Sequence, residues 1–234
     1  MKKVLFILFL VIVFALAIFA SPPPNRRGTK TSTSATPTAT DDSDATFSKD
    51  SLSGPANGKV CNVSKIKTKA NGTQLVNGGQ SCSFTQLGEI PDVSQMVSSL
   101  IISPNNEDVI EVNTPFTVSV LSANLATGNF DNPKTEYYLF SQQLNKKGFI
   151  KGHSHITIQQ LNSKASPPDA RDFVFFKGLN QITKNSTLSV LVPDGLPAGY
   201  YRICSMTASF AHQPLLMPVA QRGSQDDCIR ITVL

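Results

Sequence analysis

Tryptophan is absent from this 234-residue chain, and only four tyrosines occur. Proteins that bind polysaccharides commonly present exposed aromatic rings as flat platforms. Here such a platform would have to come from the tyrosines, which stand in two adjacent pairs, Tyr137 with Tyr138 and Tyr200 with Tyr201. On a strand one ring of each pair would face outward, although a tyrosine more often covers a sheet edge.

Strong net charge is missing as well. The formal charge is +5, and without Lys2 and Lys3 the chain keeps 19 basic against 16 acidic residues, a net charge of +3. No run of Lys and Arg interleaved with aromatic residues occurs. Nucleic-acid binders need a concentrated basic surface, so we expect no nucleic-acid partner.

Motifs of common enzyme classes are also lacking. The chain has no H-E-x-x-H of zinc proteases, no G-x-S-x-G of hydrolases and no C-x-x-C of redox or zinc-thiolate sites. Adjacent acidic residues such as Asp226 and Asp227 do not form the spaced carboxylate pair of a glycosidase. We therefore predict no catalytic residues, and a non-enzymatic role is favoured.

The N-terminus has the layout of a secretory signal peptide. Residues 1–20, "MKKVLFILFLVIVFALAIFA", place two lysines before an apolar run and end in small residues. Cleavage after Ala20 or Ala17 is expected. An uncleaved membrane anchor is the alternative, because the run from Val4 to Ala20 reaches the lower limit for spanning a bilayer.

Residues 21–60 are rich in Ser, Thr, Pro and Asp, as in "TSTSATPTATDDSD". Such a segment buries too little apolar surface to offset the entropy of ordering, and its composition is typical of an O-glycosylated stalk. We predict a disordered stalk, followed by one compact domain at 61–234. The membrane would be contacted only through an uncleaved signal segment.

All four cysteines lie within the predicted domain, which favours an oxidising, extracellular compartment. Four cysteines allow three pairings. We expect Cys61–Cys82 and Cys204–Cys228, because each pair brackets one local segment, although the sequence leaves the crossed pairings open. N-x-S/T sequons predict glycosylation at Asn62, Asn71 and Asn185.

The domain is predicted to be all-β, an antiparallel β-sandwich of immunoglobulin-like or related type. Segments rich in Val, Ile, Thr, Tyr and Phe alternate with turns such as "SPNNED" and "PDGLPAG". The expected strands are 108–112, 115–121, 135–140, 149–159, 172–176, 187–192, 199–209 and 228–234. A short helix is conceivable at 91–101, "PDVSQMVSSLI".

Two of the three histidines lie one residue apart in "FIKGHSHITIQ", residues 149–159. Side chains on a strand alternate between faces, so His153 and His155 share a face that is polar, while Ile156 and Ile158 take the core face. With the third histidine, His212, they are predicted to form a surface-accessible site for copper or zinc, provided that their ring nitrogens lie within roughly 4 to 5 Å. The alternative is an exposed polar stripe without a metal.

Known H-x-H metal enzymes fit poorly. A copper/zinc superoxide dismutase requires more histidines, and a histidine-brace oxygenase requires a histidine as its first mature residue. In a cupin a glutamate follows the H-x-H, but Gln159 and Gln160 stand there, and Gln is a poor substitute for an anionic ligand.

Several stretches resemble a family of small secreted fungal proteins of unknown function, some of which are mislabelled as a small-subunit ribosomal protein. These are "GHSHITIQ", "DFVFFKGLN", "GLPAGYYRICSM" and above all "HQPLLMPVAQRGSQDDCIRITV". The resemblance covers roughly residues 80–234 and implies a secreted or wall-associated fungal protein. It supplies no catalytic residues.

Two function classes therefore remain. The first, which the sandwich and stalk favour, is a non-enzymatic extracellular or cell-wall module that binds a wall polysaccharide or a surface protein. The second, which the histidines favour, is an extracellular copper or zinc protein.

Overall fold

The computed structural model describes residues 59–75 and 79–234. The predicted signal peptide, residues 1–20, and nearly all of the predicted stalk, residues 21–60, lie outside the described residues. Helix is limited in the described part to α1 (Lys59–Val63) and one 3-10 turn (Val93–Gln95). Neither of these has the length and apolar run that a membrane crossing needs.

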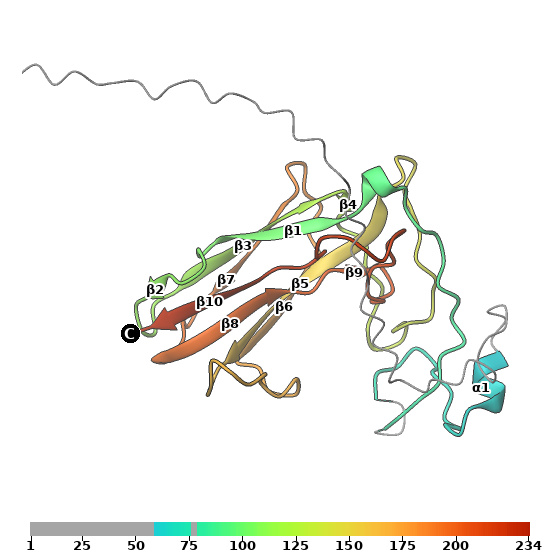
Figure 1. Cartoon of the computed structure of the whole chain (residues 1–234), viewed down its shortest axis with the longest axis horizontal. Coiled ribbons are helices and arrows are strands. Elements are labelled where there is room, and N and C mark those ends of the chain that lie inside the picture. Colours follow the sequence, from blue (N-terminus) through green and yellow to red (C-terminus); the bar gives the residue numbers. More distant parts are fainter. Residues whose placement is uncertain (1–58, 76–78) are drawn as a thin grey trace, which may run out of the picture. The chain divides into compact units, whose positions relative to one another are not determined.

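Ten strands make up the rest of the regular structure of the described residues (Figure 1). They are β1 (Ser98–Ser103), β2 (Val109–Ile110), β3 (Phe116–Ala123), β4 (Leu125–Ala126), β5 (Ile150–Gln160), β6 (Phe175–Leu179), β7 (Thr187–Val192), β8 (Gly199–Ser205), β9 (Ala208–Ser209) and β10 (Cys228–Val233).

The strands form two sheets packed as a sandwich. One sheet has the order β1-β3-β7, and the other has the order β2-β10-β8-β5-β4, with β6 and β9 also paired to β5. All pairs are antiparallel except the short pairs β2 with β10 and β4 with β5. The predicted all-β sandwich is confirmed.

The larger of two apolar clusters in the described residues forms the core between the two sheets. Val118 and Val120 of β3 face Ile156 and Ile158 of β5, and all four are fully buried. The strands show the expected alternation, for example buried residues at every second position of β10. Because β5 contributes its even-numbered side chains to this core, its odd-numbered ones, His153 and His155 among them, must face the other way.

Two expected elements are wrong. Residues 135–140, "TEYYLF", form no strand but a turn in which Tyr138 has φ +60°. The suggested helix at 91–101 is limited to one 3-10 turn, and the stretch from Ser98 onward is β1, whose residues alternate between exposed and buried positions. That alternation belongs to a strand, and burial of Ser99 and Ile101 against the sandwich decides the outcome.

Both expected disulfides are present, Cys61–Cys82 and Cys204–Cys228. The second joins residues that lie directly opposite each other on β8 and β10. It therefore closes a covalent ring around residues 204–228, and this ring carries His212.

Candidate metal centre

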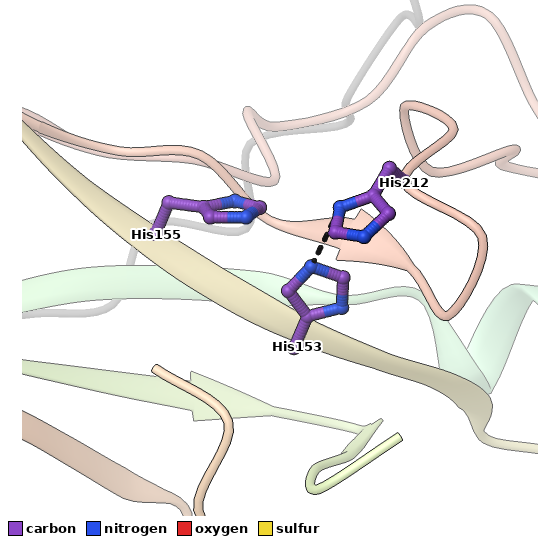
Figure 2. A group of neighbouring side chains, drawn as sticks. All are labelled: His153, His155 and His212. Atoms are coloured by element: carbon purple, nitrogen blue, oxygen red, sulfur yellow. Dashed lines mark hydrogen bonds between the residues drawn. The ribbon is translucent and has the colours of Figure 1, made fainter. Parts of the chain in front are cut away.

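Strand β5 sets the position of two of the histidines. His153 and His155 project from the same face of β5, as predicted, with ring centroids 4.6 Å apart (Figure 2). The strand is held on both sides at this point, because His155 pairs with Gly178 of β6 and exchanges two backbone hydrogen bonds with Met206. The two imidazoles consequently stand on a rigid part of the sheet.

His212 reaches the pair from a tight turn after β9. The turn closes through the His212 amide, which donates to the Ser209 carbonyl at 2.9 Å. His212 itself adopts φ +69°, a left-handed conformation that histidine tolerates better than most residues. The segment around Asp131 is tied to the same turn, since the Asp131 amide donates to the Phe210 carbonyl at 2.8 Å.

The three histidines converge, as the sequence hypothesis required. One ring nitrogen of each lies within 4.8 Å of the others, and His153 Nε2 lies 3.1 Å from His212 Nδ1. Two nitrogens on one tetrahedral zinc ion lie about 3.4 Å apart, given bonds of about 2.1 Å. The cluster therefore has the dimensions of a three-histidine metal site; that an ion binds here stays a prediction.

Backbone carbonyls fix the tautomer of each ring. His153 Nδ1 donates to the Asn129 carbonyl at 3.1 Å, and His155 Nδ1 donates to the Met206 carbonyl at 3.0 Å. His212 Nε2 donates to the Asp131 carbonyl at 3.0 Å. A carbonyl can only accept, so these three nitrogens carry the hydrogens. In neutral rings the remaining nitrogens, Nε2 of His153, Nε2 of His155 and Nδ1 of His212, are then unprotonated.

The lone pairs of His153 Nε2 and His212 Nδ1 lie close to each other. With both rings neutral, no hydrogen lies in the 3.1 Å gap between His153 Nε2 and His212 Nδ1. A shared proton, which makes the pair cationic, or a metal ion relieves that repulsion. Moving the hydrogen of His153 to Nε2 would instead set the Nδ1 lone pair against the Asn129 carbonyl. Burial, helped by the nearby His155 and His212, lowers the pKa of His153 to about 3, and burial also lowers the pKa of His155. A proton is thus disfavoured at neutral pH, and a metal cation is the better occupant.

The predicted surface-accessible site is open only on the side of His155 and His212, since His153 has no exposed surface. The polar face of β5 is covered at this point, because the rings of Phe130 and His212 pack edge-on against His153. His155 and His212 are half-buried. Alternation along β5 identifies the shared face, but it cannot reveal what the rest of the chain lays over that face.

A cavity of about 380 Å³ adjoins the cluster. It is lined by His155 and His212 but not by His153, and its walls include three aromatic rings, those of Tyr137, Tyr138 and Phe176. Tyr138, a bulky residue at φ +60°, is a backbone outlier of the kind that concentrates at functional sites. The sequence could not indicate this wall, because Tyr137 and Tyr138 lie in a segment that is predicted from the sequence to be a strand.

The methionines near His212 divide between two roles. Met206 lines the cavity, whereas Met217 packs against a small second core of Val97, Leu125, Ile150 and Leu215. The predicted asparagine sequons at Asn62, Asn71 and Asn185 all have exposed side chains. Glycosylation there stays a prediction.

The loop after His212 is fixed by hydrogen bonds between its two aspartates and distant backbone amides. Asp226 Oδ1 accepts from the Thr207 amide at 2.7 Å, and Asp227 Oδ2 accepts from the Ile101 amide at 2.8 Å. Arg222 instead donates to the Val219 carbonyl and to Gln225. The acids thus satisfy backbone amides rather than the arginine.

Comparisons with known proteins identify the family. Residues 99–234, which hold β2 to β10 and all three histidines, match the family described as the CLU5d N-terminal domain. This chain belongs to the CLU5d N-terminal domain family. The family's matched region includes both cysteines of the Cys204–Cys228 disulfide.

A curated fungal relative is similar over most of this chain. "Pathogenicity cluster 5 protein d" of Colletotrichum graminicola (strain M1.001 / M2 / FGSC 10212) is 41% identical over 188 residues, which is 77% of this chain. The chain spans 39% of the length of that relative. The resemblance to a fungal family is thereby supported, and neither description mentions a ribosomal protein.

Among solved structures, a β-glucosidase from Listeria innocua in complex with glucose aligns with 59% of this chain and 16% of its own. The sequence identity is 7% and the TM-score is 0.27.

Proposed function

We propose that this domain is an extracellular metal-binding protein that holds one Cu(II) or Zn(II) ion through His153 Nε2, His155 Nε2 and His212 Nδ1. The observation that carries the proposal is the set of three backbone carbonyls that leave one unprotonated nitrogen on each ring, in a cluster whose ligand atoms lie within 4.8 Å of one another. Ligand histidines in metalloproteins commonly donate their second nitrogen to such a carbonyl.

The residues around the site suit a borderline cation. Neutral imidazole is a good ligand for both zinc and copper, and the four cysteines are held in disulfides, so no thiolate competes. His153, buried within the domain, would form the base of the site, and the half-buried His155 and His212 would form its rim. Three protein ligands leave a further position open, where a bound ion acts as a Lewis acid.

The extracellular location is supported by the signal-like N-terminus and by the two disulfides, which persist in oxidising compartments. A role in a fungal pathogen's exchange with its host agrees with the name of the Colletotrichum relative. The metal site is compatible with the binding-module function that the sequence favours, since an ion can organise a binding surface without catalysing a reaction. A wall polysaccharide or a surface protein stays the predicted partner of that module.

The proposal is tested by metal analysis of protein secreted without a histidine tag and purified without chelators, followed by titration of the stripped protein with Cu(II) and Zn(II). One equivalent is expected to bind. His155→Asn keeps a donor for the Met206 carbonyl but removes one ligand. Four-ligand zinc sites bind with about 12 kcal/mol, so one ligand is worth about 3 kcal/mol, and affinity should fall more than about a hundredfold.

Thr157→Asn is the matched control, because Thr157 lies on the same face of β5 and contributes no ligand. This variant should bind the ion as the parent protein does. Equal affinity of the His155→Asn and parent proteins, or equal losses in both variants, would contradict the proposed site.

A further inference from the structure

The cavity beside the three histidines is placed to receive a ligand of the bound ion. His153 is buried and does not line it, while His155 and His212 do. An ion held by the three nitrogens therefore meets protein on the His153 side and the cavity on the other. Its open coordination position then faces a space of about 380 Å³, within the usual size range of small-molecule sites.

The walls of this cavity are flat and largely apolar. The rings of Tyr137 and Tyr138 stack at 4.1 Å with an angle of 18° between their planes. The ring of Phe176 lies against His155 at 5.2 Å and 27°, so that a ligand ring beside Phe176 would also be beside a metal ligand. Met206 adds a polarisable side chain to the same wall.

One carboxylate stands among these apolar walls. Asp226 lines the cavity and is held in place through Oδ1, which accepts from the Thr207 amide and the Ser205 hydroxyl. A positioned carboxylate is suited to accept a hydrogen bond from a ligand hydroxyl group.

Backbone contacts hold Tyr138 in its unusual conformation at the wall of the cavity. Its amide donates to the Ala211 carbonyl at 3.0 Å, its carbonyl accepts from the Thr85 hydroxyl, and φ is +60° between these contacts. A backbone outlier of this kind is unfavourable and persists only where its surroundings hold it. The strain presents the Tyr138 ring to the cavity beside His212.

From these features we infer that the site takes a small phenolic ligand, a single aromatic ring with one or two adjacent hydroxyl groups, whose oxygen occupies the open position of the ion. The inference rests on the proposed metal site. A phenol has a pKa of about 10, within the range that coordination to a divalent ion brings down to neutrality, whereas an aliphatic alcohol is far less acidic. The aromatic walls favour a planar ring, and the ion and Asp226 favour its hydroxyl groups.

The test uses 4-nitrocatechol, whose absorption band shifts when its oxygens coordinate a metal, added to the full protein with and without Zn(II). Three comparison compounds separate the contributions: 4-nitroanisole has the ring without a free hydroxyl, cyclohexane-1,2-diol has the hydroxyls without an aromatic ring, and glucose represents saccharides. We expect the absorption band of 4-nitrocatechol to shift with the zinc-loaded protein and not with the metal-free protein. None of the three comparison compounds should displace 4-nitrocatechol.

Phe176→Thr removes one wall from an exposed strand position without removing a metal ligand. It should weaken 4-nitrocatechol binding by about tenfold while zinc affinity, measured separately, changes little. Phe140→Thr is the control, since Phe140 is as exposed as Phe176, at 45% and 47%, but does not line the cavity.

The outcomes distinguish a failure of the phenolic ligand from a failure of the metal site. If zinc binds but 4-nitrocatechol gives no shift, or glucose displaces it, the phenolic ligand is wrong and the metal site stands. If both phenylalanine variants weaken the ligand equally, the cavity is not its site and the inference fails. If zinc does not bind at all, both proposals fall together.

Discussion

Replacing His153 by asparagine should make the metal-free protein less sensitive to acid. The asparagine amide would still donate to the Asn129 carbonyl, but this side chain has no titratable ring. In the parent protein the pKa of His153 is lowered to about 3, chiefly by burial, whereas an unfolded histidine titrates near 6.5. As the pH falls below 6.5, the unfolded chain therefore takes up a proton that the folded protein refuses, and stability is lost until the pH nears 3.

The size of this effect follows from that difference. Each pH unit between the two pKa values costs about 1.4 kcal/mol of unfolding free energy. From pH 7.5 to pH 4 the loss attributable to His153 is thus at most about 3 kcal/mol. His155, whose pKa burial also lowers, adds a loss of the same sign in both proteins, so the difference between them isolates His153.

The assay is urea denaturation in EDTA at pH 7.5, 6, 5 and 4, followed by circular dichroism because the chain has no tryptophan. Ile150→Val is the control, since it disturbs a buried position of the same strand without removing a titratable group. It should be less stable at every pH and keep the parent slope. If His153→Asn also keeps the full parent slope, the protonation argument for this buried ring is refuted.

Three further predictions concern the frame around the site. Replacing both Cys204 and Cys228 by serine should lower the unfolding free energy by about 3 kcal/mol, measured by urea denaturation, because the disulfide closes a loop with a sequence separation of 24; unchanged stability would contradict this. Gly152→Ala should lower the unfolding free energy by about 1–3 kcal/mol in the same assay and weaken zinc binding, since a Cβ there would meet the Ala208 carbonyl oxygen at 2.2 Å. Gly223→Ala is the control, because the space around Gly223 is open, and it should change neither quantity. Protein secreted from a eukaryotic host should lose mass on treatment with an N-glycosidase, and a protein of unchanged mass would exclude glycans at the exposed sequons Asn62, Asn71 and Asn185.

Local patterns in the sequence predict much of the fold correctly. The strand 187–192 has the predicted bounds, and β5 differs from its predicted range by one residue at each end. Both disulfides follow from the rule that each pair brackets a local segment. These features depend on β propensity, alternation and short chain separation, which are properties of neighbouring residues.

The features that the sequence could not supply depend on long-range packing. Tyr137 and Tyr138 have high β propensity, yet hydrogen bonds to the distant carbonyls of Gly72 and Ala211 hold them in a turn. His153 lies on a polar face of β5 that distant parts of the chain bury, with Phe130 and His212 packed against its ring. For the candidate site, the sequence named the three histidines, but the carbonyls that orient them come from Asn129, Asp131 and Met206 and carry no side-chain signal.

The disulfide Cys204–Cys228 has a consequence for resistance to proteolysis. His212, Met206 and Asp226 all lie between these two cysteines, on a segment whose turns are exposed in part. A protease that cuts once within residues 206–227 produces two new chain ends but releases no piece, because the cystine still joins them. The turn that carries His212 would remain attached to β8 on one side or to β10 on the other, and its hydrogen bonds to the segment around Asp131 would still hold it against the sheet. We therefore expect singly nicked protein, recognised by its separation into two fragments only under reducing conditions, to keep the three histidines together.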